Sequence, residues 1–442
     1  MPVKHFFRTH TLIAGTLFLT GAGLLSRILG FFYRIYLSRA IGAESLGIYQ
    51  MIFPVYGICF SLCAGSIQTA ISRFTAAEPF RAKKILSVGF LISLCIALLL
   101  SFGIWTNADF IAVHILKEPR CTPLLPAMAL AIPCTAVHAC ICGYYYGKEH
   151  VQIPAIAQLL EQCIRIFSVF VIVSICQQHG REITTRAAVI GLVIGEAASA
   201  LFTLICFLSS DISTEHAGNA FPSSFLTTAR PLMTLAAPLM ANRLVMNTLR
   251  SAEAILIPNR LVLYGLTQAQ ALSIYGTLTG MAMPFILFPS AIFNSLAVIL
   301  LPSVAKHQSS GNTGRIKKTL IFSFRCSLYM GILCIGIFTL FGEKLGIWVF
   351  QNQDAGTFIT ILAWLCPFLY LTTTTGSILN GLGKTAATFQ NNLIAMSIRL
   401  VFVYFGIPHF GILAVLWGML ASEILLTVLH LNTLRLLFHS GK

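Results

Sequence analysis

Residues 11–37 form one long apolar run, TLIAGTLFLTGAGLLSRILGFFYRIYL, which is interrupted by the charges of Arg27 and Arg34. The run is long enough to cross a bilayer, because a membrane-spanning helix needs about 20 apolar residues. An arginine at bilayer depth is costly, so it usually faces a water-filled cavity or a partner instead of lipid. The charges set deep in the apolar runs are Arg27, Arg34, Arg165, Arg243, Arg250 and Arg399 against Glu161, Glu196, Glu253 and Glu423, whereas Arg325 and Arg435 lie close to cytoplasmic helix ends. The excess of arginine predicts a cationic internal cavity and an anionic cargo.

The composition extends this pattern to the whole chain. Of its 442 residues, 57% are hydrophobic and 10% are charged, which excludes a water-soluble domain of this size. The length allows about twelve spans of about 20 residues. We predict them at 11–37, 46–72, 85–107, 122–146, 154–177, 187–209, 229–253, 269–303, 319–341, 355–381, 389–408 and 411–437. The predicted fold class is an all-α polytopic membrane protein with about 12 transmembrane helices.

The net charge of +15 indicates how the chain lies in the membrane. With both termini in the cytoplasm, most loop lysines and arginines, including Arg73, Arg81 and Arg230, fall on the inner side. This distribution agrees with the positive-inside rule. The same distribution explains the net positive charge without a nucleic-acid partner. The sequence also has no module of basic and aromatic residues of the kind that binds nucleic acid.

Two pairs of similar stretches indicate an internal duplication. RIYLSRAIGAESLGIY at 34–49 matches RLVLYGLTQAQALSIY at 260–275 in spacing, and Gly-Lys followed by Ile-Arg recurs from Gly147 and from Gly383. The polar stretch 210–228 separates the halves. We therefore expect an N-lobe at 1–209, a cytoplasmic linker at 210–228 and a C-lobe at 229–442. Because six spans per lobe is an even number, the repeats should be parallel.

Helical spacing predicts which side chains line the cavity. Arg27 and Arg34 lie seven residues apart on one face of the first helix, and Arg243 and Arg250 repeat this separation on the seventh. Stripes of small residues are also typical of ordinary helix packing, which explains arginine pairs poorly. The predicted cavity residues are Arg27, Arg34, Arg243, Arg250, Glu253, Asn247, Gln50 and Gln68.

Several of these charges have a second interpretation. Arg34, Arg250 and Glu253 lie near helix ends and could extend to the outer headgroups. Glu161 and Arg165, four residues apart, could neutralise each other locally. A role in coupling to a cation is assigned to Glu196, Glu423 and Glu161, for which a structural hydrogen bond is an equal alternative.

The sequence predicts no enzyme, no cofactor and no metal site. The run Gly381 to Thr385 imitates the end of a phosphate-binding loop, but Ile378 stands where that motif requires glycine. Most of the thirteen cysteines lie in apolar helices, where cysteine behaves as a small hydrophobic residue. The cluster of His138, Cys140 and Cys142 lacks a second pair of ligands.

Four stretches resemble a known family. They are GLLSRILGFFYRIYLSRAIGAESLGIYQMIFPVY at 23–56, ILIPNRL at 255–261, YGTLTGMAMP at 275–284 and SILNGLGK at 377–384. They are similar to the polysaccharide-exporter and stage V sporulation protein B branch of the multidrug/oligosaccharidyl-lipid/polysaccharide (MOP) exporter superfamily, which also contains the lipid II flippases. The Ser-Arg-x-Leu-Gly-Phe motif of those flippases is matched by Ser26, Arg27, Leu29, Gly30 and Phe31. Their second arginine follows six residues later and precedes aspartate, whereas Arg34 follows seven later and precedes Ile35.

The resemblance implies two six-helix lobes of the MATE/MOP type around a central cavity. It implies a flippase that moves an undecaprenyl-diphosphate-linked saccharide from the inner to the outer leaflet of the bacterial cytoplasmic membrane by alternating access. The implied partners are this lipid-linked saccharide diphosphate, membrane lipids and a coupling H⁺ or Na⁺. Two alternatives stay open: a cation-coupled multidrug antiporter of the same fold, and a non-transporting membrane protein of envelope or spore assembly.

Overall fold

The computed structural model describes residues 2–180, 184–211, 225–294, 297, 300, 304, 308 and 313–439. These residues form two compact units. The first unit contains Met1–Gly30 and Met51–Ser251, and the second contains Phe31–Gln50 and Ala252–Lys442. The division of the chain into lobes at 1–209 and 229–442 stays a prediction, and the linker predicted at 210–228 lies largely outside the described residues.

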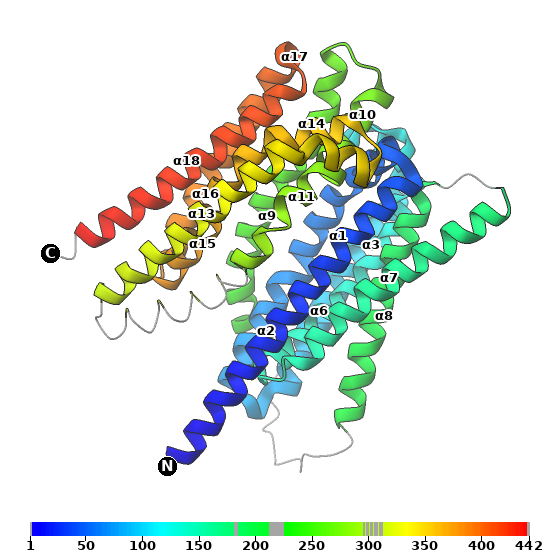
Figure 1. The fold of residues 1–442 in the computed structure, drawn as a ribbon. Coiled ribbons are helices and arrows are strands. Elements are labelled where there is room, and N and C mark those ends of the chain that lie inside the picture. Colours follow the sequence, from blue (N-terminus) through cyan, green and yellow to red (C-terminus); the bar gives the residue numbers. More distant parts are fainter. Residues whose placement is uncertain are drawn as a thin grey trace. The chain divides into compact units, whose positions relative to one another are not determined.

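The first unit is built from helices that follow one another along the chain (Figure 1). Three short helical turns, Ser61–Gly65, Pro79–Arg81 and Ile111–Leu116, join or extend longer helices, and a fourth lies at Pro119–Cys121. The helices that lie wholly or partly in this unit are α1 (Pro2–Phe60), α2 (Ser66–Ala77), α3 (Ala82–Thr106), α4 (Ala108–Phe110), α5 (Leu125–Ala129), α6 (Ala131–Gly147), α7 (Gln152–Gln178), α8 (Thr185–Asp211) and α9 (Phe225–Leu263). Residues 31–50 of α1 and 252–263 of α9 belong to the second unit.

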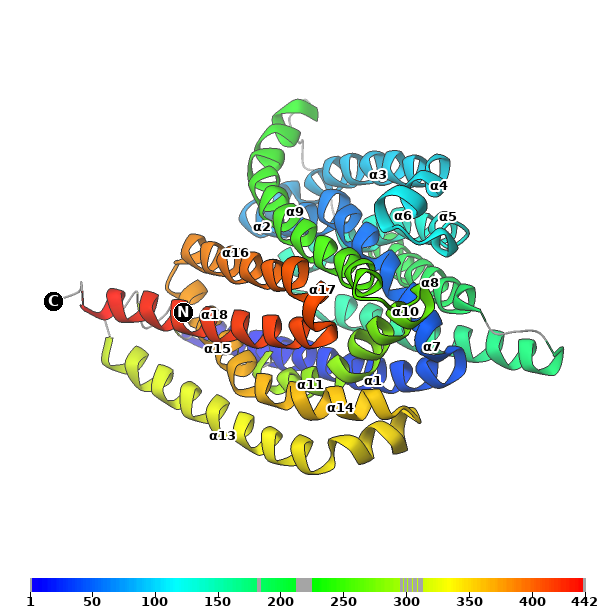
Figure 2. The same ribbon diagram turned by 90° about the horizontal axis from the view of Figure 1, so that it is seen from above.

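The second unit also consists of helices in the part that the structure describes. Helical turns lie at Thr277–Ala282, Gly346–Phe350, Ala363–Leu365 and Phe402–Gly406. The helices are α10 (Gln268–Gly276), α11 (Met283–Leu287), α13 (Thr313–Leu345), α14 (Gln353–Leu362), α15 (Cys366–Gly381), α16 (Thr385–Val401), α17 (Ile407–Phe410) and α18 (Ile412–His439). Figure 2 shows α16 and α18 side by side, and these two helices pack against each other.

Helix α1 unites the first two predicted spans. Its backbone departs from helical geometry only at Gly42, with φ 78° and ψ 172°, where the helix is kinked. A positive φ is readily adopted only by glycine, so this residue lets the chain bend without ending the helix. The unit boundary falls inside α1, because residues 31–50 group with the second unit.

The described residues contain nine candidate membrane spans by length and apolar composition. One of them, Phe18–Ala77, includes the first two predicted spans. The other eight correspond to predicted spans three to six and nine to twelve. The seventh and eighth predicted spans correspond to α9 and to the α10–α11 region. They are not among the nine, and α9 carries five charged side chains, at Arg230, Arg243, Arg250, Glu253 and Arg260. The chain is therefore a multi-pass, all-α membrane protein, as predicted.

Glycines allow the helices of each unit to approach closely. A Cβ on Gly143 of α6 would lie 2.6 Å from the carbonyl oxygen of Gln68 on α2. A Cβ on Gly331 of α13 would lie 2.7 Å from the Cβ of Pro367 on α15. Small residues at such contacts are the usual means of packing helices in membranes. The core of the first unit, around Ile67, is completed by apolar side chains of α3, α6 and α9.

Candidate functional site

A buried carboxylate organises the polar interior of the first unit. Glu196 on α8 is 6% exposed. Its Oε1 accepts a hydrogen bond of 2.9 Å from the hydroxyl of Tyr56, and its Oε2 accepts one of 3.0 Å from Thr135 on α6. A buried acid needs such donors, because an unsatisfied charge in an apolar interior is strongly unfavourable. We call Tyr56, Thr135, Glu161, Arg165 and Glu196 the Glu196 cluster.

Arg165 connects the two acids of this cluster. It forms an ion pair with Glu161 one helical turn away on α7, as the four-residue spacing predicted. Its Nη2 also lies 3.8 Å from Oε1 of Glu196. One guanidinium therefore faces two carboxylates. With all three groups ionised, the cluster carries an excess negative charge.

The Glu196 cluster borders a cavity of about 360 Å³. This volume is within the range of small-ligand pockets. Of the residues predicted from sequence, Gln68, Glu161 and Glu196 line it, whereas no arginine does. The full lining is Tyr56, Gly57, Phe60, Gln68, Thr135, His138, Ala139, Glu161 and Glu196. This cavity inside the first unit is therefore acidic, and it differs from the cationic cavity that the arginine count predicts.

The polar face of α9 is bound beside this cavity, within the first unit. Asn247 donates hydrogen bonds from Nδ2 to the carbonyl of Gly57 (3.1 Å) and to Oγ of Ser61 (2.6 Å). One turn earlier, Arg243 donates from Nη2 to Oγ1 of Thr69 at 3.2 Å. A Cβ on Gly65 would collide with the Arg243 guanidinium. The Arg243 guanidinium therefore occupies the space that a side chain at position 65 would fill.

Arg27, Arg243 and Arg250 have no carboxylate partner among the described residues of the first unit. Arg27 and Arg250 are exposed and Arg243 is half-buried. The ion pairs among the described residues of that unit involve other arginines. Arg165 differs from them because it is held between two acids. The arginines thus divide into acid-paired and acid-free groups.

The second unit has polar contacts of the same kind. Glu253 on α9 is 7% exposed and lies 2.6 Å from Nε of Arg399 on α16. Glu423 on α18 accepts a 3.0 Å hydrogen bond from Thr372 on α15. Glu253 thus has an arginine partner inside the second unit. Arg34, which is exposed, and Gln50, which is half-buried, belong to the same unit.

The threonine–glutamate bond recurs in both units. Thr135 donates to Glu196 in the first and Thr372 donates to Glu423 in the second, both at 3.0 Å. In each unit one long helix separates the threonine helix from the glutamate helix along the chain: α7 in the first unit and α16 in the second. Sequence reasoning did not select either threonine, because a lone hydroxyl in an apolar helix resembles a packing residue. Their only sequence signal is their place in corresponding helices.

The backbone around these acids repeats as well. In the first unit, a Cβ on Gly191 of α8 would lie 3.2 Å from the carbonyl oxygen of Arg165. In the second, a Cβ on Gly418 of α18 would lie 3.6 Å from the carbonyl oxygen of Arg399. The glutamate follows its glycine at the same spacing in both units. Each unit thus places one arginine-bearing helix closely against one glutamate-bearing helix.

Comparison with known proteins identifies the family. The model of a family described as polysaccharide biosynthesis protein matches residues 12–308, about two thirds of the chain. The chain belongs to the polysaccharide biosynthesis protein family. Stage V sporulation protein B of Bacillus subtilis is 28% identical to this member of the family over 433 residues, which is 96% of this chain and 83% of that protein.

Solved structures confirm the fold of this family member. The lipid II flippase MurJ in an inward closed conformation matches with a TM-score of 0.72 and 14% identity, over 95% of this chain and 87% of that one. A multidrug resistance MATE family transporter of the MOP superfamily, facing inward, matches with a TM-score of 0.70 and 13% identity, over 97% of this chain and 100% of that one. The family match and the relative in Bacillus subtilis confirm the resemblance stated from the sequence, and the two solved structures agree with it in fold. The matched flippase and transporter also agree with the expectation that the chain is not an enzyme.

Proposed function

We propose that the protein is a flippase that moves an undecaprenyl-diphosphate-linked saccharide from the inner to the outer leaflet by alternating access. Membership of the polysaccharide biosynthesis protein family and the flippase fold support this function. We propose the bacterial cytoplasmic membrane as its location, with both termini in the cytoplasm. The polyprenyl tail would stay in lipid while the charged headgroup crosses the protein.

The acid-free arginines are the observation that carries the proposal. Arg27, Arg243 and Arg250 have no carboxylate within the described part of the first unit, whereas Arg165 and Arg399 are paired. A guanidinium without an acidic partner near bilayer depth keeps donors available for an anion, and this holds for Arg243 too, which uses Nη2 on Thr69 and has further N–H groups. Its planar donors pair bidentately with phosphate oxygens, which suits a diphosphate better than a point charge would.

The other predicted residues take supporting roles in this proposal. Gln50 and Gln68 would contribute neutral hydrogen bonds to the saccharide diphosphate and Arg34 a charge-assisted one. Asn247, whose Nδ2 already donates to Gly57 and Ser61, would accept from a saccharide hydroxyl at its Oδ1. Glu196, Glu423 and Glu161 would bind the coupling H⁺ or Na⁺. Glu253, which is paired with Arg399, would hold that arginine in place. The proposal needs no cofactor and no metal.

Reconstitution tests this function directly. Proteoliposomes with a labelled undecaprenyl-diphosphate saccharide in the inner leaflet should expose the label on the outside when the wild-type chain is present. Arg27→Ala should slow the transfer roughly ten- to a hundredfold, because one charge-assisted contact contributes about 1.5–3 kcal/mol. Arg27→Lys should recover part of the rate, because lysine keeps the charge without the bidentate geometry. Arg186→Ala, which removes an exposed arginine of α8, is the matched control.

The acid-lined cavity favours one alternative, a cation-coupled multidrug antiporter of the same fold. Glu161 and Glu196 border about 360 Å³, and acids of this kind suit a cationic substrate. If the protein is an antiporter, Arg27→Ala should leave the transport rate nearly unchanged and Glu196→Gln should abolish transport. The wild type should then export a cationic dye. Undiminished lipid transfer in Arg27→Ala together with dye export would replace the flippase proposal by this one.

A further inference from the structure

A second cavity lies in the first unit between α2 and the beginning of α9. Its volume is about 650 Å³, which is enough for a headgroup. Each helix contributes one arginine to it, Arg73 from α2 and Arg230 from α9. The remaining lining is mostly apolar and consists of Phe74, Ala77, Pro231, Thr234 and Leu235. We call this cavity the α2–α9 cleft.

Both arginines of the cleft lack an acidic partner in the part of the first unit that the structure describes. Arg73 and Arg230 are both exposed, and among the described residues of the first unit no acid pairs with either. Glu78, which follows α2, is held by Arg81 through an ion pair of 2.9 Å. The cleft therefore keeps two positive charges on apolar walls, and this combination is suited to an anion that carries a hydrocarbon group.

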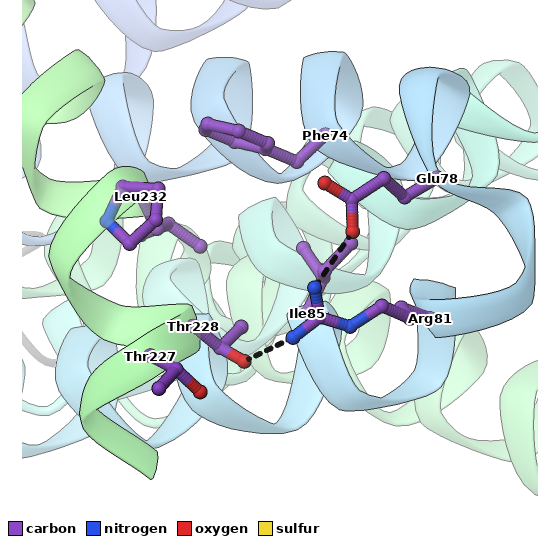
Figure 3. Close-up of a pocket in the computed structure, with 8 residues that line it drawn as sticks. Phe74, Glu78, Arg81, Ile85, Thr227, Thr228 and Leu232 are labelled. Atoms are coloured by element: carbon purple, nitrogen blue, oxygen red, sulfur yellow. Dashed lines mark hydrogen bonds and ion pairs between the residues drawn. The ribbon is translucent and has the colours of Figure 1, made fainter. Parts of the chain in front are cut away.

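The walls of the cleft are fixed by the contacts beside it, which Figure 3 shows. The guanidinium of Arg81 donates to Oγ1 of Thr228 at 3.2 Å and so binds the beginning of α9 to the turn after α2. Leu232, one turn further along α9, is 1% exposed and belongs to the core around Ile71 and Ile85. Because Arg230 lies between these two anchors, the backbone that carries it is held in a defined position.

The surroundings of the cleft indicate a membrane surface. Phe80, in the turn between α2 and α3, is fully exposed, and Leu226 at the beginning of α9 is 72% exposed. Large apolar side chains exposed next to arginines are typical of the boundary between headgroups and acyl chains. A soluble anion would gain nothing from such neighbours.

We propose that the α2–α9 cleft binds the phosphate of a lipid headgroup between the guanidinium groups of Arg73 and Arg230. The apolar walls at Phe74, Pro231 and Leu235 would accept the first carbons of the lipid. This inference is independent of the proposed function, because such a lipid would bind here whichever substrate the protein moves. The lipid has two sources that share this chemistry: the diphosphate lipid of the flippase proposal and an anionic lipid of the bilayer.

Native mass spectrometry of the full-length protein in detergent tests the site. The probes are undecaprenyl diphosphate, phosphatidylglycerol and inorganic phosphate, each titrated separately. Arg73→Gln and Arg230→Gln should each weaken binding of at least one lipid roughly tenfold, because one charge-assisted contact is lost. The lipid affinity of Arg230→Lys should lie between those of Arg230→Gln and the wild type, because lysine keeps the charge without the bidentate geometry. Arg186→Gln removes the same charge from the same unit at a residue that does not line the cleft, and it should bind as the wild type does.

The pattern of losses identifies the source. An effect on undecaprenyl diphosphate alone makes the cleft a site for a diphosphate lipid, and an effect on phosphatidylglycerol makes it a site for bilayer lipid. The proposal is overturned if neither lipid is affected, if only inorganic phosphate binding changes, or if Arg186→Gln has the same effect as the cleft variants. Both cleft arginines are exposed, and an unchanged melting temperature verifies that the variants fold. If the proposed lipid site in the cleft is refuted, the flippase proposal can still be tested through lipid transfer in Arg27→Ala.

Discussion

The hydroxyl of Tyr56 is one of the two hydrogen-bond donors of the buried Glu196 carboxylate, and the bond between them is 2.9 Å long. We expect Tyr56→Phe to lower the free energy of unfolding by about 1.5–3 kcal/mol, the usual value of a hydrogen bond to a charged group. Thermal unfolding in detergent measures the loss. In the double variant with Glu196→Gln, the two losses should be less than additive, because both changes remove the same bond. Strict additivity would contradict this contact.

The pair of Glu253 and Arg399 gives a sharper expectation at the same scale. Glu253 is 7% exposed and its partner lies on another helix at 2.6 Å. Removing one partner leaves a buried charge, so Glu253→Gln or Arg399→Gln should cost about 3–5 kcal/mol. Replacing both by apolar residues, Glu253→Leu with Arg399→Met, should cost less than either single change. A double variant less stable than both single variants would contradict the pair.

At the scale of single elements, the helical turn Ser61–Gly65 can pack against Arg243 of α9 only because residue 65 is glycine and has no side chain. A Cβ on Gly65 would reach the guanidinium of Arg243 and would lie 2.8 Å from the Phe60 ring. We expect Gly65→Ala to displace Arg243 and to slow lipid transfer as much as Arg243→Ala does. The control is Gly103→Ala on α3, where a Cβ meets nothing within 4 Å. It should be neutral or slightly stabilising, because alanine favours helix over glycine by about 0.5–1 kcal/mol. Equal effects of the two changes would count against this packing.

The connection between α4 and α5 can be tested by its chemistry. Burial raises the pKa of the Cys121 thiol to about 12, and the nearby Glu118 carboxylate acts in the same direction. The thiolate is the reactive form, so Cys121 should stay unmodified by maleimide at pH 7–8 in the folded protein. Residue-resolved mass spectrometry measures the modification, and the denatured chain is the control. Modification of Cys121 at the same rate in both states would show that this connection opens readily.

At the scale of the whole molecule, the topology remains a prediction that accessibility decides. Residues 216 and 312 fall in loops that we predict on the cytoplasmic side. In a cysteine-free background, His216→Cys and Asn312→Cys should react with a membrane-impermeant reagent only in opened cells or inverted vesicles. Labelling of both positions from outside intact cells would refute the orientation.

The sequence predicted the class of fold well because its signals are local. Apolar runs of about 20 residues mark spans, and the spacing of Glu161 and Arg165 marks a pair on one helix face. The partner of Glu253 could not be predicted in this way, since Arg399 lies on a helix far along the chain and any of several arginines could have served. Tyr56 was missed for another reason: a neutral hydroxyl in an apolar helix has no distinctive spacing.

The passage of α1 through both units has a consequence for biosynthesis. Residues 31–50 leave the ribosome early, but the remainder of their unit begins only at Ala252. At about 5–20 residues per second, the intervening chain takes roughly 10–40 s to be made. During that time the segment has none of its final neighbours from α10 to α18, while the first unit is complete as soon as Ser251 has emerged. The N-terminal helix must therefore enter the bilayer by its own hydrophobicity, and residues 31–50 are the last part of it to become packed.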